Sequence, residues 1–479
     1  MGITVVGLGP GAPEQMSVAA WRAVEQAGEV YVRTRRHPTV EALPGSPVVH
    51  SFDEVYEECA GFAEVYEEIA RRVLTLGARP NGVVYCVPGH PLVAETSVLR
   101  LLELAPPAGL AVRVVPSESF ASPALVALGV AGAELQLVDA LGLAQRWHPD
   151  LIVDRPALIS QLYDRDTASA VKLTLLASYA PEHPVSLVRA AGTRDEAVRT
   201  VPLTELDRQT GIDHLTALYV PPRAQPSSLE AFQDTVARLR APGGCPWDRE
   251  QDHQSLREAL LEETHEVLEA IDNEDWAELR VELGDLLMQI CMHAQIASEG
   301  GLFGIYDVVA GIDQKIRRRH PHVFGDASVS DSGEVLRNWE EIKRAERGES
   351  DSRSLLAGVP GGLPALGQAN AYQKRVARVG FDWADADGVW AKLAEEIGEL
   401  RAAPEDRRQD ELGDLLFTVV NLARHLDLDA ETALRTTNAR FRHRFEAMQA
   451  LAVERDLDLA RLSLPEQDAL WDEVKRREA

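Results

Sequence analysis

The spacing of hydrophobic positions changes once along this chain of 479 residues. Before residue 222, short β-branched runs such as "ITVVGLG", "GEVYV", "GVVYCVPG", "AVRVVPS" and "HPVSLVRAAG" alternate with stretches of helical periodicity. That alternation predicts an α/β domain over residues 1–222. A cluster of Pro and Ser follows, and the pattern beyond it is almost wholly helical. We therefore predict a linker at residues 223–230 and an all-α region after it.

The helical region contains an internal repeat. "AFQDTVARLR" is echoed by "AYQKRVARVG", "LLEETHEVLEA" by "KLAEEIGELRA", "VELGDLLM" by "DELGDLLF", and "NWEEIKRAE" by "LWDEVKRRE". Matching segments in the same order indicate a duplicated unit. The prediction is one all-α repeat over residues 231–347, a linker over 348–364 and a second repeat over 365–479.

Acidic residues interrupt an otherwise apolar helix in each repeat. At about 100° per residue, Glu282 and Asp285 of "VELGDLLMQI" share one narrow stripe, and Glu411 and Asp414 of "DELGDLLFTV" do the same. A helix that is apolar nearly all round is typically buried. We therefore expect these helices to be enclosed, with carboxylates that need cations or hydrogen-bond donors. The alternative is a solvated acidic face, which would be broader and rich in Lys and Glu.

The preceding helix of each repeat supplies two more carboxylates at the spacing E-x-x-E. Hard oxygen ligands, without a dominant imidazole or thiolate, favour Mg²⁺ over zinc, with Mn²⁺ as a second choice. The predicted metal ligands of the first repeat are Glu263, Glu266, Glu282 and Asp285. Those of the second repeat are Glu396, Glu399, Glu411 and Asp414.

Basic residues follow each acidic helix along the chain. Arg440 and Arg444 are four residues apart and so lie on one helix face, where guanidinium groups can bind phosphate oxygens. Lys315 and Arg319 are their counterparts in the first repeat. Because Mg²⁺ held by carboxylates commonly handles substrate phosphates, we interpret these residues as phosphate ligands. The alternative interpretation is a solvated basic face.

The net charge of −27 narrows the choice of partners. Such an acidic surface repels the nucleic-acid backbone, so duplex binding is not expected. No apolar run approaches the ~20 residues of a membrane span, and the N-terminus is predicted to form a strand rather than a signal peptide. The four cysteines are scattered without ligand spacing, so we expect no disulfide framework or zinc site, and a cytoplasmic location.

The helical region resembles MazG, a family of nucleoside triphosphate pyrophosphohydrolases. The resemblance rests on "GCPWDREQ", "EETHEVLEAI", "ELGDLL", "RRRHPHVFGD", "QKRVARVGFDW" and "LWDEVKRRE" and extends over residues 228–479. It implies Mg²⁺-dependent cleavage of nucleoside triphosphates to monophosphates and diphosphate by a homodimer of helical bundles, in nucleotide-pool sanitation. It also implies that four of the metal ligands are catalytic, namely Glu396, Glu399, Glu411 and Asp414.

The same resemblance implies which residues hold the substrate. Lys392 aligns with Ala259, so the first repeat lacks one basic contact and we expect the second repeat to be the main catalytic site. The residues implied to contact triphosphate and base are Lys392, Glu395, Arg440, Arg444 and Trp471, with Lys315 and Arg319 in the first repeat.

Residues 1–222 resemble the tetrapyrrole (precorrin/uroporphyrinogen) methylase family. The likeness lies in "ITVVGLGPG", "VVYCVPGHPLVAETSVL", "VVPSESFASPALVALGV" and "PVSLVRAAGTRDEAVRTVPLTELD". It implies two α/β subdomains with S-adenosylmethionine in the cleft between them. Ala12 and His90 stand where the family usually has Asp, and backbone contacts to a cofactor need no particular side chain there. The implied cofactor-binding residues are Gly9, Pro10, Gly11, Gly89, His90 and Pro91.

The whole chain is thus predicted to be multidomain, with an α/β domain followed by duplicated all-α repeats, and resembles the YabN-type bacterial fusion proteins. The leading hypothesis is a nucleoside triphosphate pyrophosphohydrolase with an N-terminal domain of separate role. One alternative is an S-adenosylmethionine-dependent tetrapyrrole methyltransferase that the helical part regulates. Another is an N-terminal module that senses a tetrapyrrole or the methyl donor.

Overall fold

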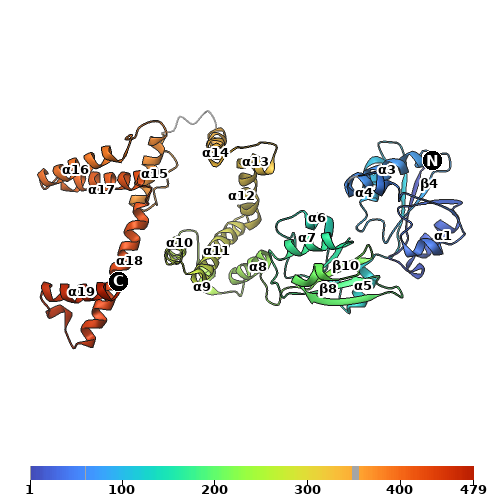
Figure 1. The fold of residues 1–479 in the computed structure, drawn as a ribbon, viewed down its shortest axis with the longest axis horizontal. Coiled ribbons are helices and arrows are strands. Elements are labelled where there is room, and N and C mark those ends of the chain that lie inside the picture. The colour runs from blue at the N-terminus through green and yellow to red at the C-terminus, as the bar shows by residue number, and fades with distance from the viewer. Residues whose placement is uncertain (1, 60, 348–354, 479) are drawn as a thin grey trace. The chain divides into compact units, whose positions relative to one another are not determined.

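The computed structural model of the chain describes residues 2–59, 61–347 and 355–478. The chain divides into two compact units, residues 1–250 and 251–479. The first unit contains two five-stranded sheets, and the described residues of the second unit are helical (Figure 1). The predicted order, an α/β domain followed by an all-α region, is therefore confirmed.

The first sheet is built from β1 (Ile3–Gly7), β2 (Glu29–Val32), β3 (Val48–Ser51), β4 (Val83–Val87) and β5 (Val112–Val115). All its pairs are parallel, in the order β3-β2-β4-β1-β5. The helices of this half are α1 (Val18–Glu25), α2 (Val55–Glu58), α3 (Phe62–Gly77) and α4 (Thr96–Leu104). Along β1, Val5 joins the hydrophobic cluster that contains α3 and α4, and Val6 joins the one that contains α1. Both faces of the sheet are thus covered, as parallel sheets require.

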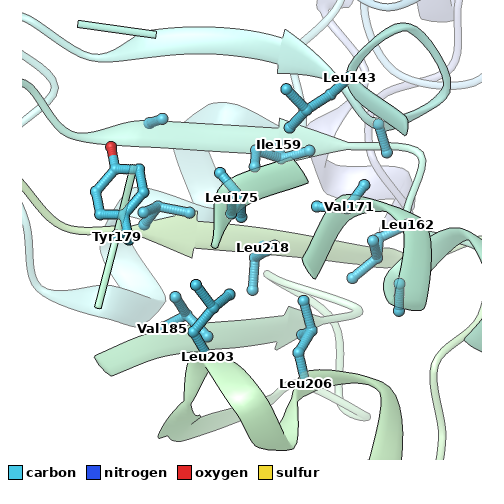
Figure 2. Close-up of a cluster of buried hydrophobic side chains, with 14 of the residues drawn as sticks. Leu143, Ile159, Leu162, Val171, Leu175, Tyr179, Val185, Leu203, Leu206 and Leu218 are labelled. Carbon is cyan, nitrogen blue, oxygen red and sulfur yellow. The ribbon is translucent and has the colours of Figure 1, made fainter. Parts of the chain in front are cut away.

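The second sheet is built from β6 (Gln136–Asp139), β7 (Ala157–Ser160), β8 (Pro184–Arg189), β9 (Ala197–Pro202) and β10 (Thr216–Val220). Its order is β6-β7-β10-β8-β9, with β6 parallel to β7 and the other pairs antiparallel. Its helices are α5 (Ala121–Leu128), α6 (Ala140–Ala144) and α7 (Arg165–Leu175). Ile159 and Leu218 of the central strands pack with Val171 and Leu175 of α7 (Figure 2). Two sheets with their own cores match the two expected subdomains.

One carboxylate holds the segment that the sequence predicts to be a linker, residues 223–230. Asp154 accepts hydrogen bonds from the N–H groups of Ser227 and Ser228, at 2.8 and 2.9 Å. Ser228 in turn caps α8 (Leu229–Arg240) by accepting from the N–H of Ala231 at 3.1 Å. Together with α9 (Pro246–Glu250), α8 belongs to the first compact unit. The domain limits drawn from the sequence stay predictions.

The second unit repeats one helical hairpin. Its helices are α10 (Arg257–Asp272), α11 (Trp276–Glu299), α12 (Ile305–Arg319), α13 (Pro321–Phe324), α14 (Ser332–Arg347), α15 (Ala365–Ala377), α16 (Ala386–Ala402), α17 (Arg408–His425), α18 (Ala430–Glu454) and α19 (Leu464–Glu478). α10 packs along α11, and α16 packs along α17 in the same way. These hairpins are the structural counterpart of the sequence repeat. Within the described residues, every helix is too short or too polar to cross a lipid bilayer.

Candidate metal and ligand sites

Each group of predicted metal ligands lies on one of the two hairpins. In the first, Asp275 caps α11 by accepting hydrogen bonds from the N–H groups of Ala277 and Glu278, at 3.1 and 3.0 Å. α11 then runs along α10, so that the E-x-x-E spacing of one helix faces the E-x-x-D spacing of the other. α16 and α17 repeat this arrangement in the second hairpin.

In the first repeat, carboxylate oxygens of Glu263, Glu266 and Glu282 lie within 4.8 Å of one another. Burial and then the Asp285 carboxylate raise the pKa of Glu263. Burial and then Glu266 and Glu278 raise the pKa of Glu282, and Glu278 was not singled out from the sequence. In the described part of the chain, no basic side chain forms an ion pair with this cluster. Its uncompensated negative charge favours a bound cation.

In the second repeat, the close cluster consists of Glu396, Glu411 and Asp414, again with oxygens within 4.8 Å of one another. Glu396 is 4% exposed, and its Oε2 atom is buried without a hydrogen-bond partner. Such an oxygen is costly unless a ligand satisfies it. A donor set made only of carboxylate oxygens fits a hard divalent cation such as Mg²⁺. The close clusters do not include Glu399 or Asp285.

Two basic residues contact the acids of the second hairpin. Lys392 Nζ lies 2.8 Å from Glu395 Oε1 and 2.9 Å from Glu396 Oε1. Hydrogen bonds to Glu395 and then to Glu396 raise the pKa of Lys392. Arg407, which the sequence analysis missed, pairs with Glu411 at 3.4 Å. The signal was present, because Arg407 precedes Glu411 by four residues, about one helical turn.

The predicted phosphate ligands lie on other helices. Arg319 of α12 pairs with Glu346, and its guanidinium carbon lies 5.8 Å from the centre of the Trp339 ring. Arg440 of α18 donates a hydrogen bond to Thr437 Oγ1 at 3.3 Å. In the described residues, neither arginine is seen to form an ion pair with the acidic clusters.

An aromatic pair lies beside the basic segment of α18. The Trp471 ring of α19 packs against Phe441 of α18, with ring centres 5.3 Å apart. Arg444 is one turn beyond Arg440 on the same helix, and Lys315 is one turn before Arg319 on α12. The structure therefore places Trp471 against the segment of α18 that carries Arg440 and Arg444.

The expectation that the acidic helices are enclosed is wrong for a single chain. Large side chains on the acidic helices are between 40 and 50% exposed, namely Leu283, Leu287, Leu412, Leu416 and Phe417. The buried polar residues Glu282, Gln289, Thr418 and Asn421 follow the polar stripe, although Asp414 is exposed, and much of the apolar surface faces outward. The physical reason is that a hairpin of two helices covers only one face of each helix.

The two glycine loops predicted to bind a cofactor meet in the first unit. Gly9 and Gly89 form an isolated antiparallel bridge, with N–H to oxygen contacts of 3.2 and 2.8 Å in the two directions. Their φ angles, +72° and +64°, are ones that glycine adopts without strain. Pro10 and Gly89 line a cavity of about 390 Å³, to which loops that follow strands of the first sheet and strands of the second sheet contribute residues. This volume suits a small organic ligand.

The other predicted cofactor residues belong to the same two loops but are not among those that line the cavity. Gly11 accepts a hydrogen bond from Thr39 Oγ1 at 3.1 Å, and His90 Nδ1 accepts one from the Leu92 N–H at 3.1 Å. Pro91 directly follows His90 in the second loop. In this structure these residues shape the loops around the cavity.

Polar side chains that the sequence analysis missed are buried at the cavity. Arg33 Nε lies 3.3 Å from Glu95 Oε2, and Glu95 is 3% exposed. Burial opposes the charged form of Arg33, but Glu95 and the neighbouring tyrosines Tyr56, Tyr66 and Tyr85 together outweigh it and raise the pKa of the guanidinium. His37 is 3% exposed and has no hydrogen-bond partner at either ring nitrogen. Burial and then Arg33 lower its pKa to about 4. The ring is therefore neutral near pH 7, and it lies at the cavity wall beside the backbone of Gly9 and Pro10.

Family comparisons agree with both parts of the fold. The model of the tetrapyrrole (corrin/porphyrin) methylases matches residues 2–207, and the model of the MazG nucleotide pyrophosphohydrolase domain matches residues 251–324. Among solved structures, the chain is similar to a uroporphyrin-III C-methyltransferase from Thermus thermophilus, at 27% identity and a TM-score of 0.37. That match covers 46% of this chain and 94% of that chain.

The fold and the carboxylate hairpins define a two-part protein, a tetrapyrrole methylase domain followed by a MazG region. The chain is 46% identical to the nucleoside triphosphate pyrophosphohydrolase of Escherichia coli K12, over 53% of this chain and 98% of that protein. It is 43% identical to YabN of Bacillus subtilis over 99% of both chains. The chain therefore belongs to the YabN family.

Proposed function

We propose that this chain is a Mg²⁺-dependent nucleoside triphosphate pyrophosphohydrolase, which converts a nucleoside triphosphate and water into a nucleoside monophosphate and diphosphate. The observation that carries the proposal is the recurrence of a tight carboxylate cluster on two equivalent hairpins. The first hairpin lies in the segment that matches the MazG domain model, and about half of the chain is similar to the E. coli nucleoside triphosphate pyrophosphohydrolase. The proposed role is sanitation of the nucleotide pool in the cytoplasm.

The carboxylates of the second repeat are proposed to hold the cation. When bound, Mg²⁺ neutralises charge on the triphosphate and activates the attacking water. Glu396, Glu411 and Asp414 supply oxygen ligands from two helices, and Glu399 adds a further carboxylate one turn from Glu396. Mn²⁺, which accepts the same oxygen ligands, is proposed to substitute for Mg²⁺.

The remaining residues of this repeat are proposed to position the substrate. Lys392, beside Glu395 and Glu396, supplies positive charge to the triphosphate. Arg440 and Arg444 bind phosphate oxygens, and Trp471 packs against the base. We propose this repeat as the main catalytic site, because the counterpart of Lys392 in the first repeat is Ala259.

A second copy of this chain is proposed to cover the exposed apolar faces of α11 and α17. Leu287 and Leu416, one on each of these helices, are among the side chains left open in the single chain. Large exposed apolar surfaces in soluble proteins mark interaction sites, and obligate homodimer interfaces are rich in such surface. Sedimentation velocity on the full chain tests this: a monomer at micromolar concentration would contradict the proposed homodimer.

A screen of canonical and damaged nucleoside triphosphates, with and without Mg²⁺, tests the proposed hydrolysis. We expect diphosphate release only when the cation is present. The screen also identifies the preferred base. If no triphosphate yields diphosphate under any of these conditions, the proposed activity is wrong.

A second function is proposed for the N-terminal domain, which carries the cavity beside Gly9 and Gly89. Its volume and the buried, neutral His37 ring in its lining fit a small ligand, and the family match favours S-adenosylmethionine or a tetrapyrrole. Isothermal titration with S-adenosylmethionine tests the cofactor, with a His37→Gln variant beside the wild type. Heat of binding would support a methyltransferase or a sensor rather than an empty scaffold. Methylation of an added tetrapyrrole would then distinguish a methyltransferase from a sensor.

A further inference from the structure

The two acidic clusters differ in the charges placed next to them. Lys392 in the second repeat corresponds to Ala259 in the first, and Arg407 corresponds to Glu278. This correspondence follows from the shared E-E-x-x-E and E-L-G-D-L-L segments. The second repeat therefore has two positive charges where the first has a neutral residue and a further carboxylate.

In the second repeat, these positive charges already engage the carboxylates. Lys392 Nζ lies 2.9 Å from Glu396 Oε1, and the Glu396 side chain is only 6% exposed. Arg407 reaches Glu411 at 3.4 Å but is itself 61% exposed, so solvent screens that pair strongly. Lys392 is thus the principal counter-ion and Arg407 a weaker one. The other oxygen of Glu396 has no partner.

In the first repeat, the corresponding carboxylates face one another. Glu282 is 9% exposed and lies among Glu266, Glu278 and Asp285. No ion pair to a basic side chain offsets them in the described residues. Like charges held this close repel one another, and a divalent cation relieves the repulsion. The charge of this cluster therefore favours a cation even in the absence of a substrate.

We propose that the repeats load divalent cations differently, the first on its own and the second tightly only together with a nucleoside triphosphate. Lys392 and Arg407 occupy the second cluster until the triphosphate offers them its own negative charge. Glu396 is then free to bind the cation. This inference rests on the proposed function, because it assumes that the second repeat binds triphosphate. It makes metal binding at the second cluster dependent on substrate, while the first cluster stays loaded.

Electron paramagnetic resonance of free Mn²⁺ tests the proposal on the full chain. Without nucleotide, we expect tight Mn²⁺ binding that Glu282→Gln removes and Glu396→Gln leaves unchanged. Addition of a triphosphate analogue with a non-hydrolysable α–β linkage should create further tight binding, which Glu396→Gln removes. Equal nucleotide-free binding at both clusters would overturn the inference and leave the pyrophosphohydrolase intact.

Exchange of the flanking charges gives a reciprocal test. Lys392→Ala with Arg407→Glu should let the second cluster bind Mn²⁺ without nucleotide, at least about tenfold tighter than in the wild type. Ala259→Lys with Glu278→Arg should weaken nucleotide-free binding at the first cluster by a similar factor. Circular dichroism establishes that both variants are folded. If neither exchange alters Mn²⁺ binding in folded protein, the flanking charges do not control metal loading. Diphosphate release measured in parallel shows separately whether the proposed function holds.

Discussion

Glu263 and Glu282 come from opposite arms of one helical hairpin, yet their carboxylate oxygens lie within 4.8 Å of each other. Their pKa values are both raised above 4.5, mainly by burial and then by neighbouring acids. The folded chain therefore binds protons at these groups more tightly than the unfolded chain. The stability that they contribute is present below about pH 4.5 and is lost as pH rises through the raised pKa values.

Because the pKa values of Glu263 and Glu282 are raised, we expect the effect of Mg²⁺ on thermal stability to depend on pH. At pH 7.5, Mg²⁺ should raise the melting temperature of the second unit, by roughly 2–4 °C per kcal/mol of binding free energy. Near pH 4.5 protons replace the cation, so the increase should vanish. Calorimetry with and without Mg²⁺ measures this increase in the wild type and in Glu263→Gln. The control is Glu454→Gln, which changes an exposed acid on α18. An equal Mg²⁺ response in both variants would place the cation elsewhere.

Loss of a carboxylate from the second cluster should remove most turnover. We expect Glu396→Gln or Asp414→Asn to lower kcat by at least about a hundredfold, because the ligand charge is lost while side-chain size is kept. Matched changes in the first repeat, Glu263→Gln and Asp285→Asn, should cost less. Steady-state kinetics on folded variants measures the difference, and similar losses from both pairs would contradict the ranking of the repeats.

Lys392 should contribute to substrate binding rather than to metal affinity in the ternary complex. Lys392→Ala removes one charge-assisted contact, which typically costs about 1.5–3 kcal/mol, or roughly ten- to a hundredfold in kcat/KM. The matched variant, Ala259→Lys, adds the missing charge to the first repeat. The kcat/KM of both variants should be measured alongside their Mg²⁺ dependence. An unchanged kcat/KM for Lys392→Ala would mean that its ion pair with Glu396 is only structural.

His37 should make the first unit less stable in weak acid. Its pKa is lowered to about 4 in the folded chain, so the unfolded chain binds more protons between about pH 4 and 6.5. Stability from this group is present above pH 6.5 and falls by about 2 kcal/mol at pH 5. Urea unfolding of wild type and His37→Gln at pH 7.5 and 5 measures the loss. The wild type should lose more stability than the variant, and equal losses would exclude His37 as the cause.

Local spacing in the sequence is sufficient to predict which acids converge. Glu263 and Glu266 are three residues apart on one helix, and Glu282 follows on the returning helix, so periodicity and a short turn place them together. The runs identified as strands, such as "ITVVGLG" and "GVVYCVPG", correspond to β1 and β4 of the first sheet. Apolar runs of this length predict strands most reliably where both faces of the sheet are buried, as in a parallel sheet.

Other features depend on distant contacts that periodicity does not contain. Arg319 is engaged by Glu346, which is 27 residues away, and Arg33, just after β2, is paired with Glu95, just before α4. The exposed apolar face of α11 could not be foreseen either, because a pattern of hydrophobic residues does not say whether the same chain covers them. His37 gave no sequence signal, since only the folded cavity shows that its ring lacks partners.

Phosphorus NMR of the reaction products is the most direct test of the proposed activity. With a nucleoside triphosphate and Mg²⁺, the account predicts diphosphate and nucleoside monophosphate as the first products, in equal amounts. Excess EDTA should abolish the reaction, and Glu396→Gln should nearly abolish it with Mg²⁺ present. Orthophosphate and nucleoside diphosphate as first products, or full activity in EDTA, would contradict the account.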